Sequence, residues 1–221
     1  MTKILGIDEA GRGPIIGPLV MAAVMMEEKE LFQLDRLGVK DSKLLAPQQR
    51  SMLFTKITEI CKHTILVITP DEIDEALKSD HNNLNWLEAQ KSAEMINSLA
   101  PDTAIVDCPS NNIEAYSAYL KNLLKNKKIK LLAEHKADYN HKIVGAASIL
   151  AKVTRDKEIE KLQEVIPVPI GSGYPSDPIT QAFVTKYYKE YGHIMRKSWE
   201  TYKSLERERT QSKLDTYNNN L

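Results

Sequence analysis

The order of the apolar segments along the chain constrains the fold more than any other feature of this sequence. Two apolar runs come in succession near the N-terminus, KILGID at residues 3–8 and LVMAAVMM at residues 19–26. Further short apolar runs, at 63–69, 103–107 and 129–135, then alternate with segments of helical spacing. Short apolar runs bounded by turn residues are typical of buried strands. Strands that alternate with helices are typical of α/β layers, so the sequence predicts an α/β fold with a mixed sheet flanked by helices.

The segments with helical spacing supply the layers that cover this sheet. Pro47 suits the first turn of a helix. Residues 141–163 combine helical spacing with small residues, which allow close packing on the sheet. The predicted helices cover residues 27–36, 47–62, 70–78, 84–100, 112–125, 141–163, 177–192 and 198–208.

A stretch rich in proline and glycine, PVPIGSGYPSDP at residues 167–178, separates the last two helices from the rest. We therefore expect a main domain over residues 1–165 and a small helical C-terminal appendage over residues 166–221. The final residues, TQSKLDTYNNNL, are polar and are expected to fray.

The overall charge leaves the binding partner open. The formal net charge is zero, so it gives no sign of nucleic-acid binding. Lysines outnumber acids between Lys121 and Lys152, yet a solvated helix surface explains most such runs. No apolar run approaches membrane-spanning length, and the N-terminus lacks the regions of a signal peptide. We therefore expect a cytoplasmic protein with no membrane partner.

Carboxylates stand at the ends of predicted strands. Asp8 and Glu9 end the first strand, and Asp107 ends the strand TAIVD. In open α/β sheets, sites gather at strand ends, so Asp8 and Asp107 come within reach of one cation if their strands are neighbours. Asp138 follows the strand at 129–135 and is a further candidate, although aspartate also suits the cap or entry of the long helix that follows. The alternative for the pair Asp8–Glu9 is a solvated strand end.

Several carboxylates at one point repel one another, and a bound cation relieves that repulsion. Hard oxygen ligands select Mg²⁺ or Mn²⁺. Two such ions about 4 Å apart can activate a water and stabilise the leaving oxygen in phosphoryl transfer. The carboxylate pattern therefore favours metal-dependent phosphoryl chemistry.

The loop after the first strand, GRGPIIG at residues 11–17, does not match the dinucleotide fingerprint G-x-G-x-x-G. Pro14 and Pro18 would disturb the helix which that fingerprint requires, so we exclude nicotinamide binding. Gly11 and Gly13 can let the backbone approach a sugar-phosphate closely, with Arg12 as a nearby cation. The alternative for this loop is a plain tight turn.

Two other loops carry side chains suited to nucleic acid. KDSK, at residues 40–43, offers lysines and a hydroxyl for phosphate contact, although such loops are usually solvated. Tyr174, in the loop GSGYPSDP, can stack on a base or a sugar, although tyrosines are common in turns.

Five segments, taken in order, resemble type 2 ribonuclease H (ribonuclease HII), in particular its archaeal form. They are GIDEAGRGPIIGP, VKDSKLL, AIVDCPSNN, AEHKADYNHKIVGAASILAKVTRD and GSGYPSDP. The resemblance implies a ribonuclease H-like mixed sheet flanked by helices. It also implies an endonuclease that hydrolyses the RNA strand of RNA–DNA hybrids and nicks at ribonucleotides embedded in duplex DNA. The products would carry 3′-hydroxyl and 5′-phosphate ends. The resemblance also implies a role in DNA replication and repair.

The resemblance assigns roles to four carboxylates. The acidic residues of the family fall on Asp8, Glu9, Asp107 and Asp138, which would be catalytic and would hold two Mg²⁺ or Mn²⁺ ions. Asp8 would bridge both ions, Glu9 and Asp107 would complete the metal shells, and Asp138 would bind or orient the second ion.

The resemblance also assigns substrate contacts. Gly11, Arg12 and Gly13 would read the 2′-hydroxyl, largely through backbone groups. Lys43 would contact the substrate, and Tyr174 would lie against the sugar at the RNA–DNA junction. We expect a monomer. The C-terminal tail carries no obvious clamp-binding motif, which leaves docking to a replication clamp open.

Two other functions remain open from the residues alone. Another ribonuclease H-like nuclease, such as a Holliday-junction resolvase or an integrase-type strand transferase, would share the acidic residues without needing the GRG loop. A non-enzymatic module that binds hybrids or RNA would use the lysine-rich face instead.

Overall fold

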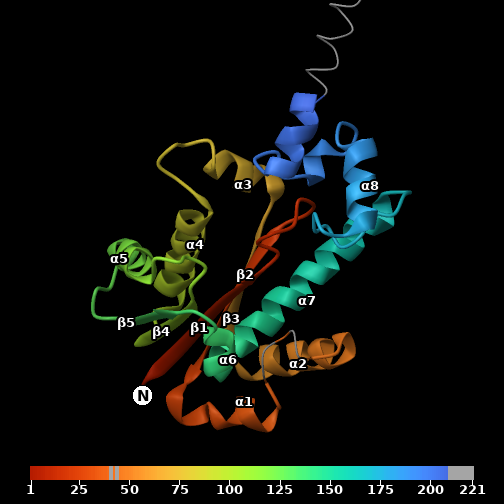
Figure 1. Cartoon of the computed structure of the whole chain (residues 1–221). Helices are drawn as coiled ribbons and strands as arrows, with labels where there is room; N and C mark the ends of the chain where they lie inside the picture. The colour runs from red at the N-terminus through yellow and green to blue at the C-terminus, as the bar shows by residue number, and fades with distance from the viewer. Residues whose placement is uncertain (40–41, 43–44, 209–221) are drawn as a thin grey trace, which may run out of the picture.

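The computed structural model describes residues 1–39, 42 and 45–208, and within these residues the chain forms a five-stranded mixed sheet. The strand order is β3-β2-β1-β4-β5 (Figure 1). β1 pairs with β2, and β2 with β3, in antiparallel fashion, whereas β1 with β4 and β4 with β5 are parallel. The strands are β1 (Lys3–Ala10), β2 (Leu19–Glu27), β3 (Lys62–Ile68), β4 (Thr103–Asp107) and β5 (Lys130–Glu134).

Helices cover both faces of the sheet (Figure 1). They are α1 (Phe32–Arg36), α2 (Pro47–Ile60), α3 (Pro70–Ala76), α4 (Leu84–Leu99), α5 (Ile113–Leu123), α6 (Ala137–Asn140), α7 (Lys142–Val165) and α8 (Pro178–Tyr187). Short 3₁₀ turns lie at Glu28–Glu30 and Gly192–Ile194, and residues 200–208 are helical. The predicted α/β fold with a mixed sheet flanked by helices is confirmed.

The apolar run of β2 follows from its place between these two helical layers. Val20, Ala22 and Val24 pack with α1, α2 and α7 on one face, while Met21 and Ala23 pack with α4 and α5 on the other. Successive side chains of a strand point to opposite faces, so a strand covered on both sides has no solvent-facing position. Its sequence therefore reads as a continuous apolar run.

The long helix α7 lies directly against β1, at Gly6. A Cβ atom at Gly6 would lie 2.5 Å from the carbonyl carbon of Ile143 and 2.6 Å from the backbone nitrogen of Val144. Only glycine admits this approach, since the neighbouring atoms belong to the backbone. Small buried residues of α7 face the sheet nearby, among them Gly145 and Ser148. The prediction that the small residues of this helix pack on the sheet is confirmed.

One short helix, α6, was not predicted as a separate element. Lys136 adopts a left-handed conformation with φ of 59° just before α6, and His141 returns to an extended conformation just after it. The Nε2 atom of His141 lies 2.9 Å from the carboxylate of Glu134, at the end of β5. Asp138 therefore belongs to α6. The alternative role for Asp138 as the cap of the long helix is wrong, because His141 occupies the N-cap position of α7.

The part of the chain after α7 has a hydrophobic cluster of its own. Its buried members come from the loop after β1 and from the C-terminal segments: Ile15, Ile16, Ile166, Ile170, Phe183, Val184, Tyr188, Ile194 and Met195. The loop after β1 is thus packed against residues near the C-terminal end of the described chain. The division into residues 1–165 and 166–221 stays a proposal, with its boundary at the end of α7.

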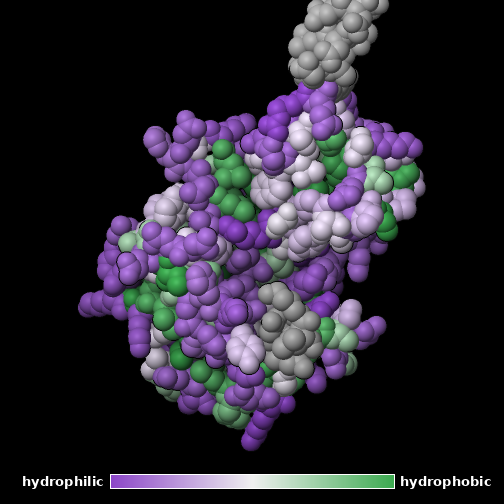
Figure 2. All heavy atoms as spheres, viewed as in Figure 1, coloured by the Kyte–Doolittle hydropathy of each residue, from purple (hydrophilic) through white to green (hydrophobic). Residues whose placement is uncertain are grey.

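The surface seen in the orientation of Figure 1 is largely hydrophilic, with apolar side chains in scattered patches (Figure 2). Among the described residues, no helix is both long enough and apolar enough to span a membrane.

Candidate active site

The carboxyl ends of three strands bring acidic side chains to one edge of the sheet. β1 and β4 are parallel neighbours, and Ile7 pairs with Val106. The next residue is Asp8 in β1 and Asp107 in β4, so these two carboxylates lie side by side. Neighbouring strands were the condition for Asp8 and Asp107 to share a site, and the structure meets it.

Asp8 is a buried carboxylate, with 5% of its surface exposed. Burial and the negative charge of Asp107 raise the pKa of Asp8 to about 8, with a smaller contribution from Asp138. Hydrogen bonds from Ser148 of α7 and from the backbone N–H of Glu9 (2.7 Å) lower the pKa of Asp8 and partly offset this rise. Asp8 therefore lies close enough to Asp107 and Asp138 for their charges to interact.

Glu9 lies on the same strand end and is half-buried. Its pKa is raised well above the usual value, first by burial and then by the charges of Glu88, Asp8 and Asp107. The positive charge of the Arg12 guanidinium lowers the pKa of Glu9. The charges of Asp8 and Asp107 thus act on Glu9, although Glu9 and Asp8 are successive residues of β1 and lie on opposite faces of the strand.

Asp107 links this strand end to α6. Its Oδ1 atom accepts a hydrogen bond of 2.8 Å from the backbone N–H of Ala137, the first residue of α6. The next residue is Asp138, which is 6% exposed. The hydrogen bond thus holds the helix that carries Asp138 against the end of β4. We call Asp8, Glu9, Asp107 and Asp138 the carboxylate cluster.

The carboxylate cluster has the chemistry of a site for a hard divalent cation, because buried, mutually repelling oxygens are the ligands that Mg²⁺ and Mn²⁺ prefer. The four carboxylates lie near one another, but this alone does not make a preformed metal site. In the described part of the chain, no three His, Cys, Asp or Glu side chains are already arranged to hold a metal ion. Oδ1 of Asp8 and Oδ1 of Asp107 each accept a hydrogen bond from a backbone N–H.

The GRG loop (Gly11–Gly13) follows directly on the carboxylate cluster. Gly11 has a φ of 85°, and a Cβ there would meet the carbonyl oxygen of Pro18 at 2.8 Å. Gly13 is different, because its Cβ would meet only the ring of Tyr174, at 3.8 Å. That ring is 37% exposed, and the guanidinium of Arg155 lies 5.2 Å from its centroid. The structure therefore brings the predicted residues Gly13 and Tyr174 face to face.

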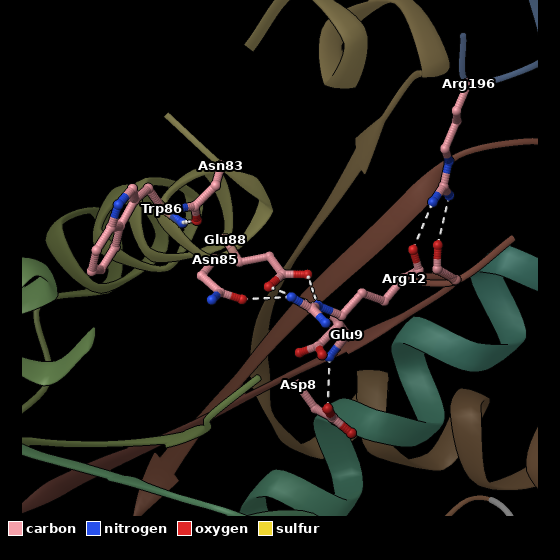
Figure 3. A network of polar contacts seen from close by, with 9 residues as sticks. Asp8, Glu9, Arg12, Asn83, Asn85, Trp86, Glu88 and Arg196 are labelled. Carbon is pink, nitrogen blue, oxygen red and sulfur yellow. Dashed lines mark hydrogen bonds and ion pairs between the residues drawn. The ribbon is translucent and has the colours of Figure 1, made fainter. Parts of the chain in front are cut away.

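Arg196, from the C-terminal segment, holds the backbone of this loop (Figure 3). Its side chain is fully buried. It donates to the carbonyl oxygens of Gly11 (2.6 Å), Arg12 (2.9 Å) and Gly17 (3.1 Å). Its guanidinium also lies 4.8 Å from the centroid of the Trp199 ring. A residue 185 positions away in the sequence thus sets the shape of the loop.

The side chain of Arg12 turns away from the loop toward α4. Its Nε atom donates to both carboxylate oxygens of Glu88, at 3.0 and 3.2 Å, and its Nη2 atom donates to Oδ1 of Asn85 at 2.5 Å. Glu88 is fully buried. Burial raises the pKa of Glu88 to about 7, against the opposing effects of Arg12 and Arg196.

Sequence reasoning missed Glu88, Asn85, Arg155 and Arg196. The spacing of α4 offered one signal, because Glu88 shares its helical face with the buried residues Ser92, Met95 and Ile96. A charged residue in such a position needs a partner of opposite charge. Lys43, predicted as a substrate contact, lies outside the described residues.

Comparisons with known proteins agree with this architecture. A family model described as Ribonuclease HII matches residues 5–202. Ribonuclease HII of Thermococcus sibiricus is 46% identical over 222 residues, which cover 96% of each chain. Ribonuclease HII of Methanococcus maripaludis (strain C6) is 45% identical over 218 residues, covering 96% of this chain and 90% of the other.

Solved structures agree as well. Ribonuclease H2 from Pyrococcus horikoshii OT3 superposes with a TM-score of 0.84 at 45% identity, over 94% of this chain and 98% of the other. Ribonuclease HII of Archaeoglobus fulgidus, solved in a complex with PCNA, gives 0.80 at 38% identity, over 91% and 96%. Bst-RNase HIII with Mn²⁺, at 21% identity and a TM-score of 0.75, shares the fold. Since the family model spans nearly the whole chain, the protein belongs to the ribonuclease HII family and is a nuclease of the ribonuclease H kind.

Proposed function

We propose that this protein is an endonuclease that hydrolyses the RNA strand of RNA–DNA hybrids and nicks at single ribonucleotides embedded in duplex DNA. The products would have 3′-hydroxyl and 5′-phosphate ends. The observation that carries the proposal is that the carboxylate cluster and the GRG loop lie next to each other at the end of β1. Asp8 and Glu9 of the carboxylate cluster lie there, the GRG loop follows directly, and Tyr174 packs against that loop at Gly13.

The carboxylate cluster would hold two divalent ions, Mg²⁺ or Mn²⁺. When bound, such ions activate a water and stabilise the charge on the attacked phosphate and on the departing 3′-oxygen. Asp8 is the candidate for the ligand shared by both ions, since the charges of Asp107 and Asp138 both act on it. Glu9 and Asp107 would complete the metal shells, and Asp138 would bind or orient the second ion. The Mn²⁺ complex of Bst-RNase HIII supports metal use in this fold.

Three hydrogen bonds would orient these carboxylates during the reaction. Ser148 and the backbone N–H of Glu9 hold the carboxylate of Asp8. The backbone N–H of Ala137 holds that of Asp107. All three donors are neutral, so they orient the oxygens and leave their negative charge for the cations.

The GRG loop would recognise the 2′-hydroxyl, the group that distinguishes RNA from DNA at a given nucleotide. Arg196 donates hydrogen bonds to the carbonyl oxygens of Gly11 and Arg12. The C=O and N–H groups of a trans peptide point in opposite directions. The N–H groups of Arg12 and Gly13 are therefore directed away from Arg196, which supports recognition through the backbone.

Tyr174 would lie against the sugar at the RNA–DNA junction. Its ring is partly exposed and faces Gly13, and the guanidinium of Arg155, from α7, lies over the ring. A sugar that packs against the exposed part of the ring would have Gly13, which carries no side chain, beside it.

The protein is expected to act as a monomer in the cytoplasm on hybrid and ribonucleotide-containing duplexes. The Archaeoglobus fulgidus relative was solved with PCNA, which makes a replication clamp a candidate partner. The tail at residues 209–221, which shows no obvious clamp-binding motif, lies outside the described residues.

A cleavage assay on three duplexes tests the proposal: an RNA–DNA hybrid, a DNA duplex with one ribonucleotide, and an all-DNA duplex. Each is incubated with Mg²⁺ or Mn²⁺, with and without EDTA. We expect metal-dependent cuts in the first two and none in the third. Equal cutting of the all-DNA duplex would instead indicate a resolvase-like nuclease. Binding without any metal-dependent product would indicate a non-enzymatic module.

A further inference from the structure

We propose that Glu88 is a positioning residue that holds the guanidinium of Arg12 on α4 and thereby leaves the carboxylate of Glu9 free to bind a divalent cation. This inference rests on the proposed function, because it takes Glu9 as a metal ligand.

The first step is the proximity of Arg12 to Glu9. The two residues are separated by two positions in the chain, and the charge of Arg12 acts on Glu9. Figure 3 shows the carboxylate of Glu9 beside the Arg12–Glu88 pair. A guanidinium readily forms two parallel hydrogen bonds with a carboxylate. Such a pair between Arg12 and Glu9 would occupy the oxygens that a cation needs.

The second step is the way in which α4 engages Arg12. Glu88 binds Nε through both oxygens, and Asn85, one helical turn earlier, binds Nη2. The first turn of α4 is itself capped, since the side chain of Asn83 accepts the N–H of Trp86 at 3.0 Å. Two donor groups of the guanidinium are therefore bound by one helix, on the side away from the loop (Figure 3).

The third step is the burial of Glu88. The side chain of Glu88 is 1% exposed, whereas that of Arg12 is 38% exposed. A buried carboxylate is tolerated when a cation compensates its charge, and Arg12 is its ion-pair partner here. The charge of Glu88 acts on Glu9 more strongly than the charge of Arg12 does, so the pair leaves Glu9 in a negative environment. Without the charge of Glu88, Arg12 could pair with Glu9, on which its charge already acts.

Metal binding by variants, in the absence of any nucleic acid, tests this inference. Mn²⁺ is titrated by calorimetry into the wild type, Glu88→Gln, Arg12→Gln and the double variant. Glutamine keeps the shape of Glu88 and removes its charge. Glu94→Gln is the matched control, because Glu94 lies on the same helix, is 58% exposed and pairs with Lys91.

We expect Glu88→Gln to weaken Mn²⁺ binding by about tenfold, which corresponds to about 1.4 kcal/mol. In the Arg12→Gln background, the same change should weaken binding by no more than about threefold, the part due to general electrostatics. Glu94→Gln should bind Mn²⁺ as the wild type does. An equal loss from Glu88→Gln with and without Arg12, or no loss at all, would overturn the inference.

Asn85→Ala keeps the test decisive if Glu88→Gln does not fold. Asn85 is partly exposed and uncharged, so its removal leaves the buried ion pair in place and loosens only one of its contacts. We expect a weakening of Mn²⁺ binding of about threefold that disappears in the Arg12→Gln background. Binding unchanged by Asn85→Ala would then count against the inference.

The outcome is separable from that of the proposed function. A protein that shows the Arg12-dependent loss of Mn²⁺ binding but cuts none of the three duplexes would overturn only the nuclease proposal. A wild type that cuts as expected, with Glu88→Gln binding Mn²⁺ normally, would overturn only the role of Glu88.

Discussion

Replacing Gly6 with alanine tests whether the packing of α7 on β1 positions the strand end that carries Asp8. Gly6 lies two residues before Asp8 on the same face of β1. Across from it runs the backbone of α7 at Ile143 and Val144, and the same helix carries Ser148, which bonds Asp8. A methyl group at Gly6 therefore presses on the helix that orients the buried carboxylate.

The geometry sets the size of the effect. The new Cβ would lie 2.5 Å from the carbonyl carbon of Ile143, whereas ordinary contact begins at 3.4 Å, a deficit of 0.9 Å. The nearest atoms are all backbone, so no side chain can turn aside. Overpacking of a well-packed core costs about 1–3 kcal/mol, and we expect the upper end here. For a chain of this size, that corresponds to a drop in Tm of about 6–12 °C.

Thermal unfolding and urea unfolding of Gly6→Ala, together with its cleavage rate on a hybrid, measure this effect. Gly13→Ala is the matched control, because a Cβ at Gly13 meets only the Tyr174 ring, at 3.8 Å. We expect Gly13→Ala to keep a near-native Tm and to lose cleavage, and Gly6→Ala to lose both. A Gly6→Ala protein that melts within about 2 °C of the wild type would refute the packing argument.

Four further outcomes are expected. Asp8→Asn should abolish cleavage and leave hybrid binding largely intact in a gel-shift assay; normal turnover would refute its assignment. Because the pKa of Asp8 is about 8 without metal, Mn²⁺ must displace a proton below that pH, so calorimetry should show affinity falling as pH drops from 8 to 6, by up to about tenfold per unit. Tyr174→Ala should slow nicking at single ribonucleotides without changing Tm; an unchanged rate would exclude the junction role. Arg196→Met, which leaves three loop carbonyls without their donor, should cost about 3 kcal/mol in urea unfolding, and a native-like midpoint would contradict it.

Local pattern explains why most of the elements were predictable. The strand at 103–107 was predicted with the bounds that β4 has, and the helix at 84–100 differs from α4 by one residue. Apolar periodicity and turn residues are properties of neighbouring positions, and these decide whether a segment forms a strand or a helix. The short helix α6 escaped this reasoning. It depends on the left-handed conformation of Lys136 and on the contact of His141 with Glu134, which periodicity does not express.

The sequence by itself determined which carboxylates end the strands and which glycines follow them, because both lie within a few positions of an apolar run. Only the tertiary structure decided the strand order that sets Asp8 beside Asp107. It also decided the partners of the GRG loop, since Glu88 is 76 positions from Arg12 and Arg196 is 185 from Gly11. A buried charge is stable only beside its counter-charge, and which distant segments meet is settled by how the layers pack.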